Sequence, residues 1–262
     1  IPDTADIPTT KLSDFEERGL LEYVNLETMY VEHVEAHFDL ETIRNAGVKI
    51  AYDAMYGAGQ NVIKRLLPDA VLLHGDYNPS FMGQAPEPID KNLKELSRLV
   101  RSDDSISMGL ATDGDADRIG MYNEDGKFVD AHHIILLLIH YLHKYKKMDG
   151  KVVVAFSTSV KVKKICEHYG LDYEVTKIGF KFICGHMVEE DVLVGGEESG
   201  GIAVKGHIPE RDGIWDGLVI LEFMTKTGKT VSGLIDEIYD IVGPFSYNRN
   251  DLHIDEELKQ AI

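Results

Sequence analysis

Cysteine is scarce in this sequence, with only Cys166 and Cys184 among 262 residues. Two cysteines in aliphatic surroundings do not make a disulfide framework, so we expect buried, reduced thiols in a cytoplasmic protein. Long hydrophobic runs are also missing. The longest one, residues 134–139, is far shorter than the roughly 20 residues that cross a bilayer, and residues 1–4 show no signal-peptide pattern.

Positive charge is in short supply as well. Lys and Arg number 27 against 45 Asp and Glu, which gives a formal net charge of −18 at pH 7. This excess of negative charge argues against nucleic acid or an anionic membrane surface as a general partner. It does not exclude a small anionic ligand, because nearby groups decide local binding. The 44% of hydrophobic residues suffice for the core of one large domain or two small ones.

The spacing of the apolar residues changes repeatedly between strand and helix periods. It first predicts strands at residues 48–52, 71–74, 107–111 and 119–122, and helices at 57–67 and 93–100. It then predicts strands at 151–156, 173–175 and 192–195, and helices at 132–145, 159–169, 182–188, 213–225 and 231–241. This alternation is typical of two successive α/β/α units with mainly parallel or mixed sheets. We place these units at residues 22–127 and 128–241.

The segment Asp113-Gly114-Asp115-Ala116-Asp117-Arg118 carries alternate carboxylates directly after a predicted buried strand. Carboxylates this close repel one another unless a cation lies between them, and oxygen-only ligands favour magnesium or calcium. Open α/β sheets bind ligands at the carboxyl ends of their strands. The sequence therefore predicts a divalent-metal site at Asp113, Asp115 and Asp117. Beside a metal, Arg118 is suited to hold a phosphate oxygen.

A calcium-binding EF-hand is the alternative for this acidic segment. Asp113, Asp115, Asp117 and Glu124 fall at the first, third, fifth and twelfth positions of such a loop. However, the sixth position holds Arg118 where the EF-hand needs glycine, and alternating apolar residues flank the loop in place of helices. The match is interpreted as coincidence.

With its neighbours, this segment resembles the magnesium loop of the α-D-phosphohexomutases, the phosphoglucomutase and phosphomannomutase family. Gly196-Glu197-Glu198-Ser199-Gly200 resembles the family's sugar-recognition loop, and Thr176-Lys177-Ile178-Gly179-Phe180-Lys181 resembles a second loop near the sugar. Upstream, Asp53–Gly59 and Asn78–Pro88 are similar to signatures of the family's second domain. The order and spacing of these segments agree over roughly residues 22 to 240.

Two other family motifs do not occur in these 262 residues. The family's first domain carries a Ser-His-Asn-Pro motif with the phosphoserine, and its fourth carries an Arg-x-Ser-Gly-Thr loop; neither string is present. The resemblance therefore implies domains two and three only, with residues 1–21 as linker from a missing first domain. Residues 242–262 would be the hinge and the start of a missing fourth domain. Those absent domains would be the chain's partners, and we expect no mutase turnover from these residues alone.

The resemblance also implies roles for individual residues. Magnesium on the three aspartates would stabilise the phosphoserine, with Arg118 assisting. By position in the family pattern, Lys161 is the expected general base; the alternative is a solvated lysine on a helix with Lys163 and Lys164.

The hexose phosphate substrate has its own set of expected contacts. Glu197 and Ser199 would bind adjacent sugar hydroxyls, and the charge of Glu197 is expected to have no buried partner among neighbouring residues. Four further residues are expected near the substrate: Lys177, Gly179, His207 and Arg211. At the last of these positions the family often has Lys in place of Arg.

The expected function is that of a fragment of a phosphoglucomutase, a phosphoprotein that interconverts hexose 1- and 6-phosphate through a bisphosphate. Glu198 between Glu197 and Ser199 favours glucose phosphate, because relatives acting on mannose or glucosamine phosphates often differ there. Phosphomannomutase and phosphoglucosamine mutase remain alternatives. A different class also remains open, namely a divalent-metal and sugar-binding module without chemistry of its own.

Overall fold

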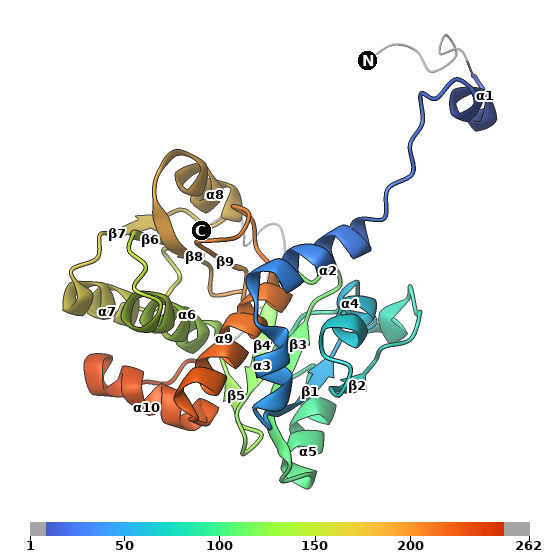
Figure 1. Ribbon diagram of the computed structural model, residues 1–262. Helices are drawn as coiled ribbons and strands as arrows, with labels where there is room; N and C mark the ends of the chain where they lie inside the picture. Colours follow the sequence, from blue (N-terminus) through green and yellow to red (C-terminus); the bar gives the residue numbers. More distant parts are fainter. Residues whose placement is uncertain (1–8, 249–262) are drawn as a thin grey trace, which may run out of the picture.

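The computed structural model describes residues 9–248 and contains two α/β units that lie side by side (Figure 1). The predicted hinge and domain start at 242–262 lie mostly outside the described residues, as do residues 1–8 of the predicted linker. The first unit contains, in chain order, α2 (Leu26–His37), α3 (Leu40–Asn45), β1 (Lys49–Asp53), α4 (Gly59–Leu66), β2 (Val71–Leu73), the 3-10 turn η2 (Phe81–Gly83), α5 (Lys94–Ser102), β3 (Ile106–Thr112), β4 (Ile119–Tyr122) and β5 (Phe128–Val129).

The first sheet has the strand order β2-β1-β3-β4-β5. β1 runs parallel to β2 and β3, whereas β4 is antiparallel to both β3 and β5. Because β1, β2 and β3 are parallel, their carboxyl ends meet at one edge of the sheet. Asp53, His74 and Asp113, at or directly after these ends, are thereby brought to the same edge.

The second unit has a four-stranded sheet in the order β7-β6-β8-β9, in which only β9 is antiparallel to its neighbour. Its elements are α6 (Ala131–His140), the π-turn η3 (Tyr141–Tyr145), β6 (Lys151–Ala155), α7 (Lys161–Tyr169), β7 (Tyr173–Thr176), α8 (Phe180–Glu189), β8 (Val192–Gly196), β9 (Ile202–Val204), α9 (Gly213–Thr227) and α10 (Val231–Val242). The predicted fold class, two α/β/α units with mixed sheets, is confirmed.

Helix α9 connects the two units. It packs against β3 and β4 of the first sheet and against β9 of the second, and Figure 1 shows it crossing between them. Gly217 on α9 lies so close to β3 that an added Cβ would be 2.6 Å from Leu110 Cδ2. One continuous cluster of buried apolar side chains accordingly extends through both units.

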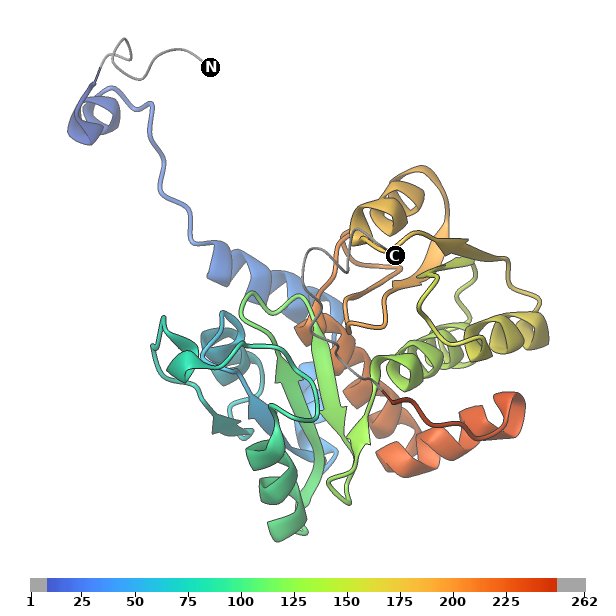
Figure 2. The same ribbon diagram turned by 180° about the vertical axis from the view of Figure 1, so that it is seen from behind.

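The amino-terminal helices were not predicted. α1 (Leu12–Glu17) has no buried residue and stands away from the rest of the protein (Figures 1 and 2). α2 buries only Val31 and Val34 within its 12 residues, so it shows little apolar periodicity. Its position depends on contacts with residues far along the chain, such as the hydrogen bonds that Tyr30 donates to Asp212. No helix between residues 9 and 248 is long and apolar enough to span a membrane.

Candidate functional site

The structure brings together the three alternating aspartates. They lie in residues 113–118, here called the metal loop, which follows β3. One carboxylate oxygen from each of Asp113, Asp115 and Asp117 lies within 4.8 Å of the others. Asp113 is buried, Asp117 is half-buried and Asp115 is exposed. The exposed Asp115 leaves the group accessible to solvent, as a metal site with access for a ligand requires.

Backbone contacts curl the metal loop. The Arg118 N–H donates to Asp113 Oδ1 at 3.0 Å, which ties the end of the loop to its start. Ala116 has a φ of +64°, a conformation that few non-glycine residues adopt. Its carbonyl accepts a hydrogen bond of 2.9 Å from the Gly213 N–H at the start of α9. The loop is therefore held in one shape before any ligand binds.

The electrostatics of the metal loop match a divalent cation. Burial, together with the negative charges of Asp117 and Asp115, raises the pKa of Asp113 to about 7, although the Arg118 N–H bond opposes the shift. Burial also raises the pKa of Asp117, against the positive charge of Arg211. Asp117 Oδ1 is buried and accepts no hydrogen bond from the described residues. A buried anionic oxygen with a free lone pair is the type of ligand that Mg²⁺ or Ca²⁺ takes, so these residues fit such an ion.

The raised pKa of Asp113 predicts a pH-dependent stability. The folded chain keeps the proton of Asp113 up to about pH 7, whereas the unfolded chain releases it near pH 4. The folded state therefore binds more protons in this window, and its stability falls as the pH rises. Between about pH 5 and about pH 8, we expect the metal-free wild type to lose more thermal stability than Asp113→Asn. Excess Mg²⁺ should restore that loss, and equal pH profiles for the two proteins would contradict this prediction.

Two arginines neutralise part of the loop's charge. Arg118 Nε lies 3.4 Å from Asp113 Oδ2 and 3.7 Å from Asp117 Oδ1. The guanidinium of Arg211 lies 2.5 Å from Asp117 Oδ2, and its Nε is 3.3 Å from Glu210. Arg211, predicted to contact the substrate, is thus placed between the metal loop and the residues that follow the sugar loop.

The sugar loop, residues 196–200, makes a tight turn after β8. The Glu197 N–H donates to the carbonyl of Gly201 at 3.0 Å, and the Gly200 N–H donates to the carbonyl of Glu197 at 3.2 Å. Glu197 is buried, and its Oε1 accepts a hydrogen bond of 2.8 Å from the Gly179 N–H. No cation pairs with this carboxylate among the described residues, and its hydrogen bond with the half-buried Gly179, 18 residues away in the sequence, could not be predicted from neighbouring residues.

The other residues around the sugar loop keep free polar groups. Ser199 is half-buried, and Lys177 is exposed. The Lys177 carbonyl accepts a hydrogen bond from Thr176 Oγ1 at 3.1 Å, but its ammonium makes no hydrogen bond or ion pair with residues 9–248. Glu198, in contrast, accepts a hydrogen bond from Ser157 Oγ. Glu197, Ser199, Lys177 and Gly179 therefore belong to one region, because the bond between Glu197 and Gly179 joins the two predicted sugar segments.

The metal loop and the sugar loop meet at their carboxyl-terminal ends, through Arg118–Ile119 on one side and Gly200–Gly201 on the other, although about 80 residues separate them. Ile119 N–H donates to the carbonyl of Gly200 at 3.0 Å, and Arg118 forms an isolated antiparallel bridge with Gly201. Gly201 also lies under the Arg211 side chain, where an added Cβ would be 2.5 Å from Cδ. The geometry places a three-carboxylate group beside a loop rich in hydroxyl-binding groups.

His207 lies apart from this arrangement. Its side chain is 3% exposed, Nε2 is 2.9 Å from Asp212, and Nδ1 is 3.3 Å from His33. The ring stacks on Trp215 with the centroids 3.9 Å apart. Both ring nitrogens are engaged, so the structure gives His207 a packing role and does not favour its predicted contact with the substrate.

Lys161 is also engaged elsewhere. Its Nζ donates to the carbonyls of Val242 and Gly243 at 2.7 and 3.3 Å, where α10 ends. The ammonium lies 5.7 Å from the centre of the Phe245 ring. None of these contacts involves the metal loop or the sugar loop. Lys161 therefore caps a helix, and its surroundings do not favour the predicted role of general base.

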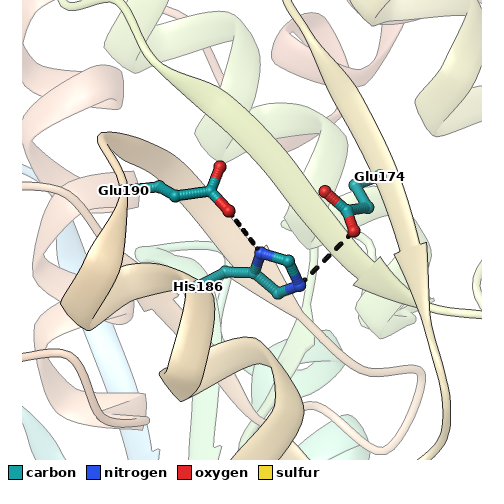
Figure 3. A group of neighbouring side chains, drawn as sticks. All are labelled: Glu174, His186 and Glu190. Atoms are coloured by element: carbon teal, nitrogen blue, oxygen red, sulfur yellow. Dashed lines mark hydrogen bonds and ion pairs between the residues drawn. The ribbon is translucent and has the colours of Figure 1, made fainter.

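A second group of possible ligands was not singled out from the sequence. His186 on α8 lies between two carboxylates, 2.8 Å from Glu190 and 3.4 Å from Glu174 (Figure 3). Lys151 forms ion pairs with the remaining oxygen of each glutamate. Because Lys151 already neutralises these carboxylates, the group is an ion-pair network that ties α8 to β6 and β7. The spacing of His186 and Glu190, four residues apart on a helix, was its only sequence signal.

Comparisons with known proteins agree with this arrangement. Residues 28–126 match the family model for phosphoglucomutase/phosphomannomutase alpha/beta/alpha domain II, and residues 130–242 match that for domain III. A phosphoglucomutase/phosphomannomutase from Thermococcus kodakarensis is 28% identical over 85% of this chain and 49% of its own. A phosphoglucosamine/phosphogalactosamine mutase from Sulfurisphaera tokodaii is 28% identical over 80% of this chain and 47% of its own.

A solved structure is also similar to this chain. The crystal structure of a protein described as "putative phosphomannomutase" from Thermus thermophilus is 32% identical, with a TM-score of 0.79. The match covers 85% of this chain and 52% of that one. The chain thus spans about half the length of the curated relatives that it matches.

Proposed function

Because this chain belongs to the phosphoglucomutase/phosphomannomutase family, as its domains II and III, we propose that the whole protein interconverts hexose 1-phosphates and hexose 6-phosphates. The direct contact between the metal loop and the sugar loop is the observation that carries this proposal. It puts groups suited to phosphate and groups suited to sugar hydroxyls at one edge of the fold. Phosphoryl transfer needs such positioning and charge neutralisation more than covalent chemistry from the protein.

Asp113, Asp115 and Asp117 would hold Mg²⁺. The bound ion would act as a Lewis acid that neutralises charge on a phosphoryl oxygen. Arg118 lies 3.4 Å from Asp113 and has a buried Nε without a hydrogen-bond partner among the described residues, so it can turn that donor toward a phosphate. Arg211 neutralises Asp117 and keeps the loop closed toward the sugar side.

Glu197 and Ser199 would bind the sugar. One oxygen of Glu197 is occupied by the Gly179 N–H, which leaves the other for a hydroxyl. Lys177, whose exposed ammonium has no partner among the described residues, would be available to the phosphate of the substrate. We do not include His207 in this set, and we assign no base within these residues, since Lys161 is held at the end of α10.

Glucose phosphate is the substrate that we propose, on the ground of Glu198 between Glu197 and Ser199. Mannose and glucosamine phosphates are the alternatives, and both correspond to the names of relatives. The phosphoserine would belong to a domain outside residues 22–241, so we propose that the present residues alone do not turn over substrate in the cytoplasm. Alone, they would bind a divalent metal and a sugar phosphate.

Removal of one metal ligand tests the proposal. We expect the wild-type chain to bind Mg²⁺ weakly, because water must replace the phosphate oxygen that completes the site. Asp115→Asn should raise the dissociation constant at least about tenfold, since a charged ligand is lost. Isothermal titration calorimetry measures this change. Asp125→Asn, at an exposed carboxylate paired with Lys127, is the matched control. An unchanged isotherm for Asp115→Asn would place the metal elsewhere.

A further inference from the structure

Strained backbone is concentrated at one place in the first unit. Seven non-glycine residues in the described chain have a positive φ, between +46° and +64°. Five of them line a single cavity of about 450 Å³ near the carboxyl ends of β1 and β2: Met55, Tyr56, His74, Phe81 and Met82. Such conformations persist only where the surroundings enforce them, and they are frequent at functional sites.

A buried carboxylate holds two of these strained residues, Met55 and His74. Asp53 is 1% exposed, and its Oδ1 accepts hydrogen bonds from the Met55 N–H at 2.9 Å and from His74 Nδ1 at 2.8 Å. A carboxylate can only accept, so Nδ1 carries the proton. In the opposite direction, the Tyr56 N–H donates to the carbonyl of His74 at 2.9 Å. His74 thus holds the turn of residues 54–56 from two sides.

The metal loop rests on the residues that follow this turn. The Ala58 N–H donates to the carbonyl of Gly114 at 3.0 Å. A Cβ added to Gly57 would be 2.5 Å from the carbonyl oxygen of Asp113 and 2.8 Å from that of Gly114. Residues 57 and 58 therefore fix the backbone from which the first metal-loop carboxylate extends. A shift of the turn would move the loop with it.

The other side of the metal loop is covered by residues that line the cavity of about 450 Å³ described above. A Cβ added to Gly114 would be 3.2 Å from Pro86 and 3.6 Å from the ring of Phe81, one of the strained residues. The loop backbone is thus enclosed between residues 57–58 and residues 81–86. Phe81 and Pro86 line the same cavity as Asp53 and His74, and residues 57–58 directly follow the turn that this pair holds.

We propose that Asp53 and His74 are positioning residues for the divalent cation. Neither contacts the three metal-loop aspartates. Their hydrogen bond holds the strained turn 54–56, the turn places Gly57 and Ala58, and these residues set the spacing of the carboxylates. This inference rests on the proposed function, because it takes Asp113, Asp115 and Asp117 as the ligands.

Substitutions at His74 separate its hydrogen bond from its backbone conformation. His74→Gly permits the positive φ but removes the donor to Asp53. His74→Asn keeps an N–H donor at the corresponding position and tolerates the same φ better than other side chains. Lys147→Gly, at an exposed residue with φ +58° outside the cavity, is the matched control. Mg²⁺ dissociation constants by calorimetry and thermal melting are measured for each, beside Asp115→Asn.

We expect His74→Gly to raise the Mg²⁺ dissociation constant about tenfold, as the loss of residues that support metal ligands does. His74→Asn should have nearly the wild-type dissociation constant. Lys147→Gly should have the wild-type value. Amide exchange by NMR should show faster exchange at Ala58 in His74→Gly. If His74→Gly binds Mg²⁺ like wild type while Asp115→Asn does not, the positioning role is refuted and the metal site stands. Equal losses in His74→Gly and His74→Asn would also refute the role of the donor. If Asp115→Asn leaves binding unchanged, the proposed metal site fails, and this inference fails with it.

Discussion

Gly200→Ala should lower the free energy of unfolding by about 2–4 kcal/mol. Gly200 has a φ of +92°, and a Cβ there would be 2.6 Å from the carbonyl oxygen of Ile119. That oxygen is backbone and cannot rotate away, so the alanine variant must both adopt a strained φ and separate the metal loop from the sugar loop. Urea denaturation with the slope held common to both proteins measures the difference.

The matched control is Gly185→Ala. Gly185 lies inside α8 and has nothing within 4 Å of an added Cβ. Alanine there should stabilise the chain by up to about 1 kcal/mol, because it is the better helix former. A Gly200→Ala variant as stable as wild type would contradict the close contact between the two loops.

The second large effect concerns Glu197 and follows from the proposed hexose phosphate mutase activity of the whole protein. Glu197→Gln should lower kcat/KM about tenfold to hundredfold while the melting temperature changes little. Glutamine keeps an oxygen that can accept the Gly179 N–H bond, so the loop 177–179 stays in place. It loses the charge, however, and a hydrogen bond to a charged group contributes roughly 1.5–3 kcal/mol, which corresponds to this range of rates where it acts in the transition state.

Two further variants make the result interpretable. Glu197→Ala also removes the acceptor for Gly179, so it should melt at a lower temperature than Glu197→Gln. Glu167→Gln, at an exposed glutamate on α7, should behave like wild type in both measurements. If Glu197→Gln melts several degrees lower but retains kcat/KM, Glu197 is structural and the assignment of the sugar loop is wrong.

The local pattern of apolar residues in the sequence was sufficient to predict most of the strands and helices. The strands near Ile50, Leu110 and Val153 are continuous apolar runs, because helices cover both faces of the sheets, and such runs are visible in the sequence. β5, with two residues, is too short to give a pattern. The three residues of β9 were not predicted either. α2 was missed for another reason: its polar and aromatic residues, such as His33, find partners near Trp215, far along the chain.

The site residues also divide into those that a local pattern predicts and those that depend on long-range contacts. Asp113, Asp115 and Asp117 are close in the chain, so spacing alone predicted that their carboxylates would converge. The hydrogen bond of Lys161 to Gly243 and that of His207 to His33 join residues far apart in the sequence, and no local motif reveals them. The Asp53–His74 pair joins the ends of two adjacent parallel strands, which only strand order brings together.

The position of α9 has a consequence for synthesis on the ribosome. The last strand of the first sheet ends at Val129, yet the helix that covers β3 and β4 begins only at Gly213. A nascent chain must therefore expose that apolar face until almost all of the second unit has been translated. Domains usually fold one after another as they emerge. Here the first unit must wait for the second, so the two are expected to reach their native state as one cooperative body.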